Sequence, residues 1–287
     1  MNAAQLIGLA INVSLVLMVF GLVLASGTLH AGALLRQPAL AARSFLAMFV
    51  VMPLVAVLIA RNFDLNRELL VTLLLVALSP VPPILPSKQL KTGGDPDYVF
   101  GLLVLTALGS ILVIPGGVAL IGRLFGRELD VPYAVAAKVA AISLLLPVVV
   151  GLLVARFAPE LARKLAKPAS LAGLVLLVAA SVPLLWKIWG LMTGAMNNFT
   201  LLAMVAFVMV GLAAGHVFGG PDASNRTALA LATATRHPGV AIAILHAVDP
   251  ANRTVAPVVL LYLLVATAAS APYVAWRKRG QTAAAGG

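Results

Sequence analysis

Long apolar runs separated by short polar stretches make up most of this sequence of 287 residues. A helix needs about 20 apolar residues to cross a bilayer, because each residue advances the helix by about 1.5 Å. Nine runs are long enough, at about 6–26, 38–60, 66–93, 97–121, 131–156, 168–188, 198–219, 224–247 and 252–276. The pattern predicts an all-α integral membrane protein with a single transmembrane domain over 1–279 and a disordered tail over 280–287.

The composition supports this class and excludes several kinds of chemistry. The chain is 62% hydrophobic and only 10% charged, and its mean hydropathy is +1.06, whereas a soluble domain carries about 25% charged residues. Cysteine is absent, so disulfides, thiolate metal sites and a cysteine nucleophile are excluded. The first run is long and follows "MNAAQ", which has no basic residue, so we expect it to be a retained span rather than a signal peptide.

The net charge of +11 is interpreted as a topology signal rather than as a nucleic-acid surface. If the N-terminus lies outside, the nine spans place eleven lysines and arginines at inner ends and loops and six at outer ones. The segments "ELARKLAK" and "RKR" contribute most of this difference. The positive-inside rule then predicts a multi-pass cell-membrane protein with an outside N-terminus and a cytoplasmic C-terminus.

Two of the predicted spans are interrupted in the same unusual way. The third span contains the segment "SPVPPILPSK", with prolines at Pro80, Pro82, Pro83 and Pro86, and the eighth is broken near Arg236-His237-Pro238-Gly239. Proline removes a backbone donor and clashes with the preceding helical turn. With nine spans, the two broken helices run in opposite directions. This arrangement is typical of inverted-repeat transporters, whose discontinuous helices meet at a binding site, although simple proline kinks are the alternative.

These residues suggest a family. The sequence resembles the bile acid:sodium symporter family in "FLAMFVVMPLVAVLIARNF", in the "GGD" after the first break and in "TATRHPGVAIAI" at the second. The resemblance implies a panel domain and a core domain that holds the crossed helices. It also implies a first repeat at about 1–121 and a second at about 168–276, with the span at 131–156 unpaired.

The sodium-binding positions of that family are changed in this chain. The resemblance places the family's glutamate on Ala232 and its glutamine-asparagine pair on Arg236 and His237. The family's serine-asparagine pair falls on Leu85-Pro86, or on Ser87-Lys88 after a shift of two residues. All nine acidic residues lie at span ends or in loops. We therefore expect no sodium site, no other metal site and no cofactor, and Lys88 or His237 would serve any proton coupling.

Lys88 and Arg236 place a cation in each broken helix, where a charge costs about 2.5–3.5 kcal/mol on insertion scales. Two roles are open: the cations replace sodium between the crossed helices, or they attract an anionic substrate. The predicted substrate-binding set is Lys88, Arg236, His237, Ser87, Thr233 and Thr235. The structural alternatives are a snorkelling Lys88, an Arg236 that caps carbonyls of the first broken helix, and hydroxyls that satisfy freed backbone.

The predicted function is secondary transport of a small organic anion by alternating access, independent of sodium. A cation/proton antiporter of similar design is the alternative, but it normally needs a carboxylate in mid-membrane. A passive anion channel is a second alternative. The sequence holds no catalytic triad, metal cluster or phosphate-binding glycine loop within its spans, so we do not expect an enzyme. The expected partners are the substrate anion and the lipid bilayer.

Overall fold

The computed structural model describes residues 3–26, 33–124, 132–195, 198–249, 252 and 254–285, and all its regular elements are helices. The first half contains α1 (Ala3–Ser26), η1 (Leu34–Arg36), α2 (Pro38–Leu46), η2 (Ala47–Val51), α3 (Met52–Asn62), α4 (Arg67–Leu78), α5 (Leu85–Lys91) and α6 (Pro96–Leu124). The second half contains α7 (Tyr133–Ala140), η3 (Ala141–Leu145), α8 (Leu146–Phe157), α9 (Pro159–Ala195), α10 (Asn198–Phe218), α11 (Ala223–Ala234), α12 (Pro238–Val248), α13 (Val255–Ala269) and α14 (Ala271–Ala285). The all-α class is therefore confirmed.

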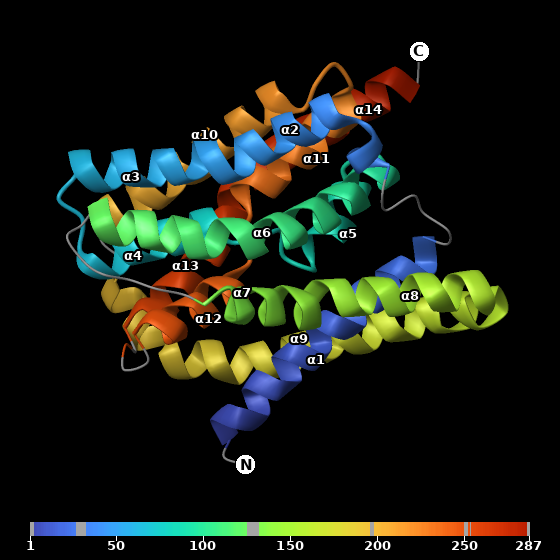
Figure 1. Ribbon diagram of the computed structural model, residues 1–287, viewed down its shortest axis with the longest axis horizontal. Helices are drawn as coiled ribbons and strands as arrows, with labels where there is room; N and C mark the ends of the chain where they lie inside the picture. The colour runs from blue at the N-terminus through green and yellow to red at the C-terminus, as the bar shows by residue number, and fades with distance from the viewer. Residues whose placement is uncertain are drawn as a thin grey trace.

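The helices form two layers (Figure 1). Helices α1, α8 and α9 pack on one another, and with α7 and η3 they form what we call the panel layer. The core layer contains α2 to α6 and α10 to α14, which pack among themselves. The layers meet where α7 contacts α6 and α12, and where α9 contacts α13.

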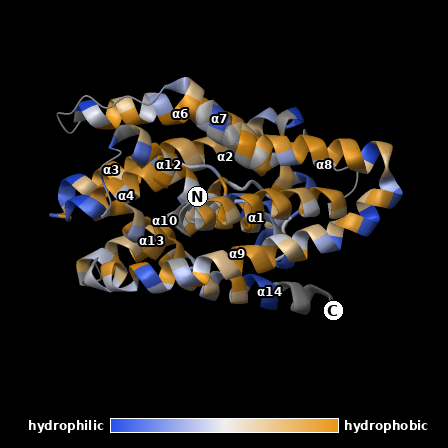
Figure 2. Ribbon diagram, turned by 90° about the horizontal axis from the view of Figure 1, so that it is seen from below, coloured by the Kyte–Doolittle hydropathy of each residue, from blue (hydrophilic) through white to orange (hydrophobic). Residues whose placement is uncertain are grey.

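Seven of the described helical stretches are long and apolar enough to cross a membrane: Gly8–Ala25, Pro38–Asn62, Pro96–Arg123, Pro159–Pro183, Phe199–Phe218, Ala223–Ala247 and Val255–Gly280. Apolar residues dominate these helices in Figure 2. The two other predicted spans, at 66–93 and 131–156, consist of shorter helices. Prolines interrupt the first between α4 and α5, and a π-helix divides the second between α7 and α8. The number of nine spans therefore stays a prediction.

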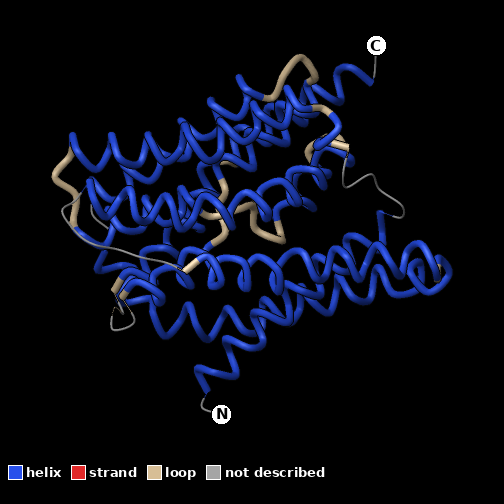
Figure 3. The backbone as a smooth tube through the Cα atoms, viewed as in Figure 1, coloured by secondary structure: helices blue, strands red, loops and turns tan. Residues whose placement is uncertain are grey.

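Both predicted interruptions are present, and they appear as loop segments in the middle of the core layer (Figure 3). The first runs from Ser79 to Ile84, between α4 and α5, and the second from Thr235 to His237, between α11 and α12. Pro86, Pro238 and Gly239 differ from expectation, because they lie in the first turn of the following helix rather than in the break. Proline is favoured at that position, since the first helical amides have no intrahelical acceptor.

Glycines on α10 and directly after its end bring α11 unusually close. A Cβ atom added at Gly215 would lie 2.5 Å from the Ala230 Cα and the Leu229 carbonyl oxygen, and one at Gly219 would lie 2.5 Å from the Arg226 Cα. Small residues permit such backbone contact between membrane helices. Helix α10 therefore supports the first half of the second broken helix along its length.

The C-terminal segment also differs from the prediction. Helix α14 extends to Ala285, whereas we expected a disordered tail from residue 280. Alanine and glutamine are good helix formers, and they continue the helix beyond the apolar run. Residues 286–287 lie outside the described part of the chain.

Candidate functional site

The two interruptions meet directly. The backbone N–H of His237 donates a hydrogen bond to the carbonyl of Pro80 at 3.0 Å. His237 and Thr235 have extended backbone conformations that end α11 and begin α12. The predicted proximity of the two breaks is confirmed by this contact. It joins segments more than 150 residues apart in the sequence, and the side chains around it form the candidate site.

Neighbouring hydroxyls satisfy part of the backbone that the first break exposes. The Val81 N–H donates to the Thr106 hydroxyl of α6 at 3.4 Å, and the Ser79 hydroxyl donates to the Leu75 carbonyl at 2.9 Å. Unpaired backbone groups within a membrane are tolerated only where protein or water satisfies them. Thr106 and Ser79 therefore support the break structurally.

Arg236 is completely buried, with 0% of its surface exposed. Its Nη2 donates to the carbonyls of Met48 and Ala77, both at 2.5 Å, and its Nε donates to the Val76 carbonyl at 3.3 Å. The Phe49 ring lies beneath the guanidinium, 5.5 Å from ring centroid to Cζ, a cation–π contact. A single side chain thus joins the second break to α4 and to η2.

The sequence explains why these carbonyls are available. The α-helical partner of the Val76 carbonyl would be the amide of residue 80, but Pro80 has no N–H. The amide of Val81, which would serve Ala77, donates to Thr106 instead. Carbonyls at a helix C-terminus carry partial negative charge, so a buried cation is favourable there. The location matches the structural alternative for Arg236, a cap on the first broken helix.

His237 acts as the N-cap of α12. Its Nδ1 accepts a hydrogen bond from the Val240 N–H at 3.3 Å, so the neutral ring carries its proton on Nε2. Nε2 is buried and has no partner among the described residues. Thr233 donates to the Leu229 carbonyl at 2.7 Å, whereas the Thr235 hydroxyl is buried without a described partner. The Thr233 hydroxyl therefore donates within its own helix, α11.

Lys88 and Ser87 lie on α5 and are only half-buried. Neither a hydrogen bond nor an ion pair joins the Lys88 ammonium group to another residue that the structure describes. The structure therefore separates the two predicted cations. Arg236 donates to three backbone carbonyls, although its Nη1 is buried without a described partner. Lys88 is half-buried, and its ammonium group has no described partner.

Sequence reasoning missed two side chains that hold the second broken helix. The Tyr262 hydroxyl of α13 donates to the carbonyl of Ala234, the last residue of α11, at 2.7 Å. Gln89 Nε2 donates to the Ala228 carbonyl at 2.7 Å and thereby joins α5 to α11. The available signal was a tyrosine inside an apolar run, because a buried tyrosine hydroxyl usually has a partner.

The tyrosine contact yields a first prediction. Replacing Tyr262 with phenylalanine leaves the Ala234 carbonyl without its donor in a buried place, so we expect the free energy of unfolding to fall by about 1–2 kcal/mol. Thermal unfolding of the purified protein in detergent measures the change. The control is Tyr133→Phe, since Tyr133 is 58% exposed. Equal stability of the two variants would contradict the capping role.

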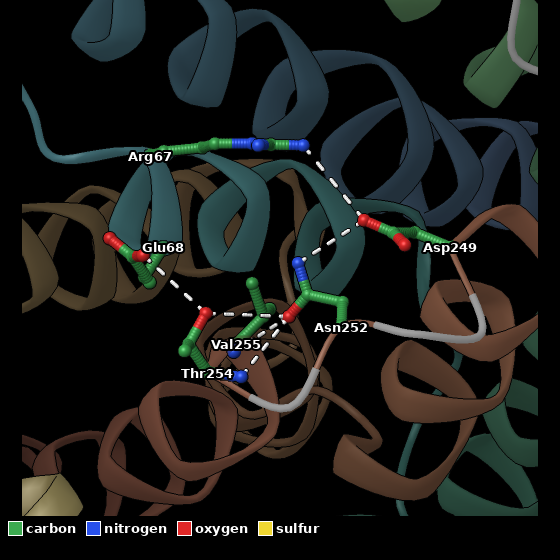
Figure 4. Close-up of polar contacts among 6 residues, drawn as sticks. All are labelled: Arg67, Glu68, Asp249, Asn252, Thr254 and Val255. Carbon is green, nitrogen blue, oxygen red and sulfur yellow. Dashed lines mark hydrogen bonds and ion pairs between the residues drawn. The ribbon is translucent and has the colours of Figure 1, made fainter.

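A polar network ties the broken helices at their opposite ends (Figure 4). Arg67, at the start of α4, lies 3.9 Å from the Asp249 carboxylate that follows α12. Asn252 donates to Asp249, and its Oδ1 accepts from the amides of Thr254 and Val255 at the start of α13. The ion pair is exposed, so its contribution to stability is small. It marks where the two broken helices approach each other again.

Two interrupted helices that meet inside a bundle of apolar helices are an arrangement that many secondary transporters share. The sequence matches the Sodium Bile acid symporter family over residues 12–184. This match covers more than half of the chain, so the protein belongs to that family. It includes the first break and ends before the second. No curated protein sequence matches the chain.

Proposed function

We propose that this protein carries a small organic anion across the membrane by alternating access and that it does so without sodium. Membership of the family makes it a transporter. One observation carries the sodium proposal. The Arg236 guanidinium already donates hydrogen bonds to the carbonyl oxygens of Met48, Val76 and Ala77, which are therefore engaged without an ion.

Electrostatics argue against an additional cation beside Arg236. Two like charges about 4 Å apart repel by roughly 4 kcal/mol at an effective dielectric near 20. Ala232, on which the resemblance places the family's sodium-binding glutamate, is an entirely buried methyl group. No group of three or more histidine, cysteine, aspartate or glutamate side chains that could hold a metal ion exists among the described residues. In this proposal Arg236 is a permanent cation of the fold, with no need to bind and release an ion.

The anionic character of the substrate is inferred from Lys88. Lys88 is half-buried on α5, next to Ser87 in the sequence, and its ammonium group has no described partner. A partly desolvated cation attracts an anion more strongly than an exposed one does. The Nε2–H of His237 and the Thr235 hydroxyl, both without described partners, are further donors for a carboxylate if the crossing opens. The inverted repeat, the nine spans and the outside N-terminus complete the proposal.

Counterflow in proteoliposomes tests the carrier class. Vesicles that hold the purified protein are loaded with an unlabelled bile acid or a small carboxylate, and uptake of the labelled compound is followed. We expect uptake above equilibrium that depends on the internal compound, because a carrier returns faster when it is loaded. Uptake that ignores the internal compound indicates the alternative, a passive channel.

A further inference from the structure

A cavity lies at the end of the core layer where α2, α6 and α11 begin (Figure 1). Its volume of about 440 Å³ falls within the range of about 300–1,000 Å³ for small-molecule sites. The lining residues belong to η1, α2, α6 and α11 or directly precede them, so no helix of the panel layer takes part. Asn225 in the wall lies ten residues before Thr235, which is about 15 Å along α11. The cavity is therefore separate from the crossing of the two breaks.

Three aspartates line this cavity: Asp95, Asp97 and Asp222. Carboxylates are common at helix starts, where they cap amides and interact favourably with the helix dipole. Asp95 has that role, since its Oδ1 accepts a hydrogen bond from the Tyr98 N–H at 2.8 Å, whereas the Asp222 side chain caps no amide of α11. Neither Asp95 nor Asp222 forms an ion pair within the described part of the chain. The described lining residues include no lysine, arginine or histidine, so the cavity carries negative charge.

Two buried amide oxygens at this end of the core layer lack a donor. Asn225 is 8% exposed and Gln89 is 0% exposed, and neither Asn225 Oδ1 nor Gln89 Oε1 has a described partner. An acceptor fixes the orientation of each amide, because Asn225 Nδ2 donates to the Asp222 carboxylate at 3.5 Å and Gln89 Nε2 donates to the Ala228 carbonyl at 2.7 Å. Ala228 lies one helical turn after Asn225. A buried acceptor without a donor is unfavourable, so this region lacks a hydrogen-bond donor.

We propose that the cavity binds a small organic cation with two or more ammonium groups. Such groups supply N–H donors for Asn225 and positive charge for Asp95 and Asp222, whereas water would satisfy an oxygen but leave the charge unbalanced. A single metal ion is a poorer match. The described residues contain no group of three or more histidine, cysteine, aspartate or glutamate side chains that could hold one. The cavity also greatly exceeds the volume of about 30 Å³ that one water molecule takes up in the liquid.

The bound cation would join η1 and α2 to the starts of α6 and α11, all of which line the cavity. We therefore expect it to stabilise this end of the core layer, because a ligand that binds only the folded protein shifts the unfolding equilibrium. The proposal goes beyond the proposed function and does not depend on it, since none of the lining residues belongs to the crossing.

Equilibrium dialysis of labelled spermidine, a triamine, tests the site on the purified protein in detergent at fixed ionic strength. The test variant is Asp95→Asn/Asp222→Asn, which removes two charges while asparagine retains the ability to cap a helix. The control is Asp64→Asn/Glu68→Gln. It makes the same change in net charge just before and within the first turn of α4, outside the cavity.

We expect one saturable site, with binding at least about tenfold weaker in the test variant, because two exposed ion pairs together contribute about that factor. The control variant should bind like the native protein, and n-butylamine, which has a single ammonium group, should compete poorly. Binding that does not saturate, or equal affinities in the test and control variants, would overturn the proposal. Displacement of spermidine by an equal concentration of magnesium would also overturn it, in favour of a hydrated metal ion.

Asn225→Leu separates a ligand-binding role from a structural one. The substitution removes the buried Oδ1 that has no described donor, so we expect thermal unfolding of the ligand-free protein at an equal or higher temperature. Spermidine binding should nevertheless weaken, and the stabilisation by spermidine should shrink with it. Unchanged spermidine binding in a less stable Asn225→Leu protein would mean that Asn225 is purely structural and would overturn the proposal.

Discussion

Replacing Arg236 with methionine is expected to lower the free energy of unfolding by about 3 kcal/mol. Methionine fills a similar volume but donates no hydrogen bond. The carbonyls of Met48 and Ala77 would then be buried without their donor, at about 1–3 kcal/mol each, whereas the Val76 carbonyl would keep its bond from the Ser79 amide. The loss of a buried charge offsets part of this effect. Thermal unfolding in detergent and the yield of monodisperse protein measure the change.

Arg236→Lys separates charge from geometry in the same assay. Lysine keeps the cation but lacks the planar fork, whose Nη2 donates to Met48 and Ala77 while Nε donates to Val76. We therefore expect a stability between those of the native protein and Arg236→Met. If Arg236→Met retains full stability and loses only substrate affinity, then Arg236 binds the substrate and the structural assignment is wrong.

The second large effect is expected on substrate binding. Replacing Lys88 with methionine should weaken binding of the anion by about 2 kcal/mol, or roughly 30-fold, at the low end of the range for removing one partner of a desolvated charge pair. The low end applies because Lys88 is only half-buried. The concentration dependence of uptake in proteoliposomes measures the change, and thermal unfolding should show little difference.

Lys91→Met provides the matched control for Lys88→Met. Lys91 is an exposed lysine one turn later on α5, so its removal changes the net charge equally. We expect it to leave the apparent affinity almost unchanged. Equal affinities in the two variants would mean that Lys88 reaches the membrane surface, as the snorkelling alternative holds, and does not contact the substrate.

The sequence was sufficient to locate the two breaks, because prolines inside apolar runs have a direct backbone consequence. It could not fix the limits of the breaks. Pro86 and Pro238 look like interruptions in the sequence, yet each begins a helix. The two cations were also visible as charges within spans. Which of them is exposed depends on the packing of α4 and η2 around the second break.

The partners of Arg236 have no sequence signature. Backbone carbonyls are present at every position, and they become acceptors only where the helix geometry frees them. The run "AMFVVMP", which forms the π-helix η2, has the composition of an ordinary apolar helix. The role of Tyr262 could not be predicted for a related reason. Its acceptor is the Ala234 carbonyl at the end of α11, and the sequence does not specify where that helix end lies.

The contacts between the broken helices bear on how the transporter moves. The two broken helices are joined in three places. Gln89 bonds to Ala228, His237 bonds to Pro80, and Arg67 pairs with Asp249. We expect the core layer to move as one body against the panel layer, because these bonds link its halves at three levels. In the proposed function, Arg236 is a permanent cation at the crossing, so that no ion would need to leave and return during that movement.

Sodium replacement tests the central claim most directly. Uptake of the anion identified by counterflow is measured in proteoliposomes with external sodium or with choline, at fixed osmolarity and membrane potential. The account predicts equal initial rates within about twofold in the two media, because coupled ligands usually change each other's binding by about 5–150-fold. A loss of about tenfold or more without sodium, within that coupled range, would contradict it and would mean that a cation binds beside Arg236.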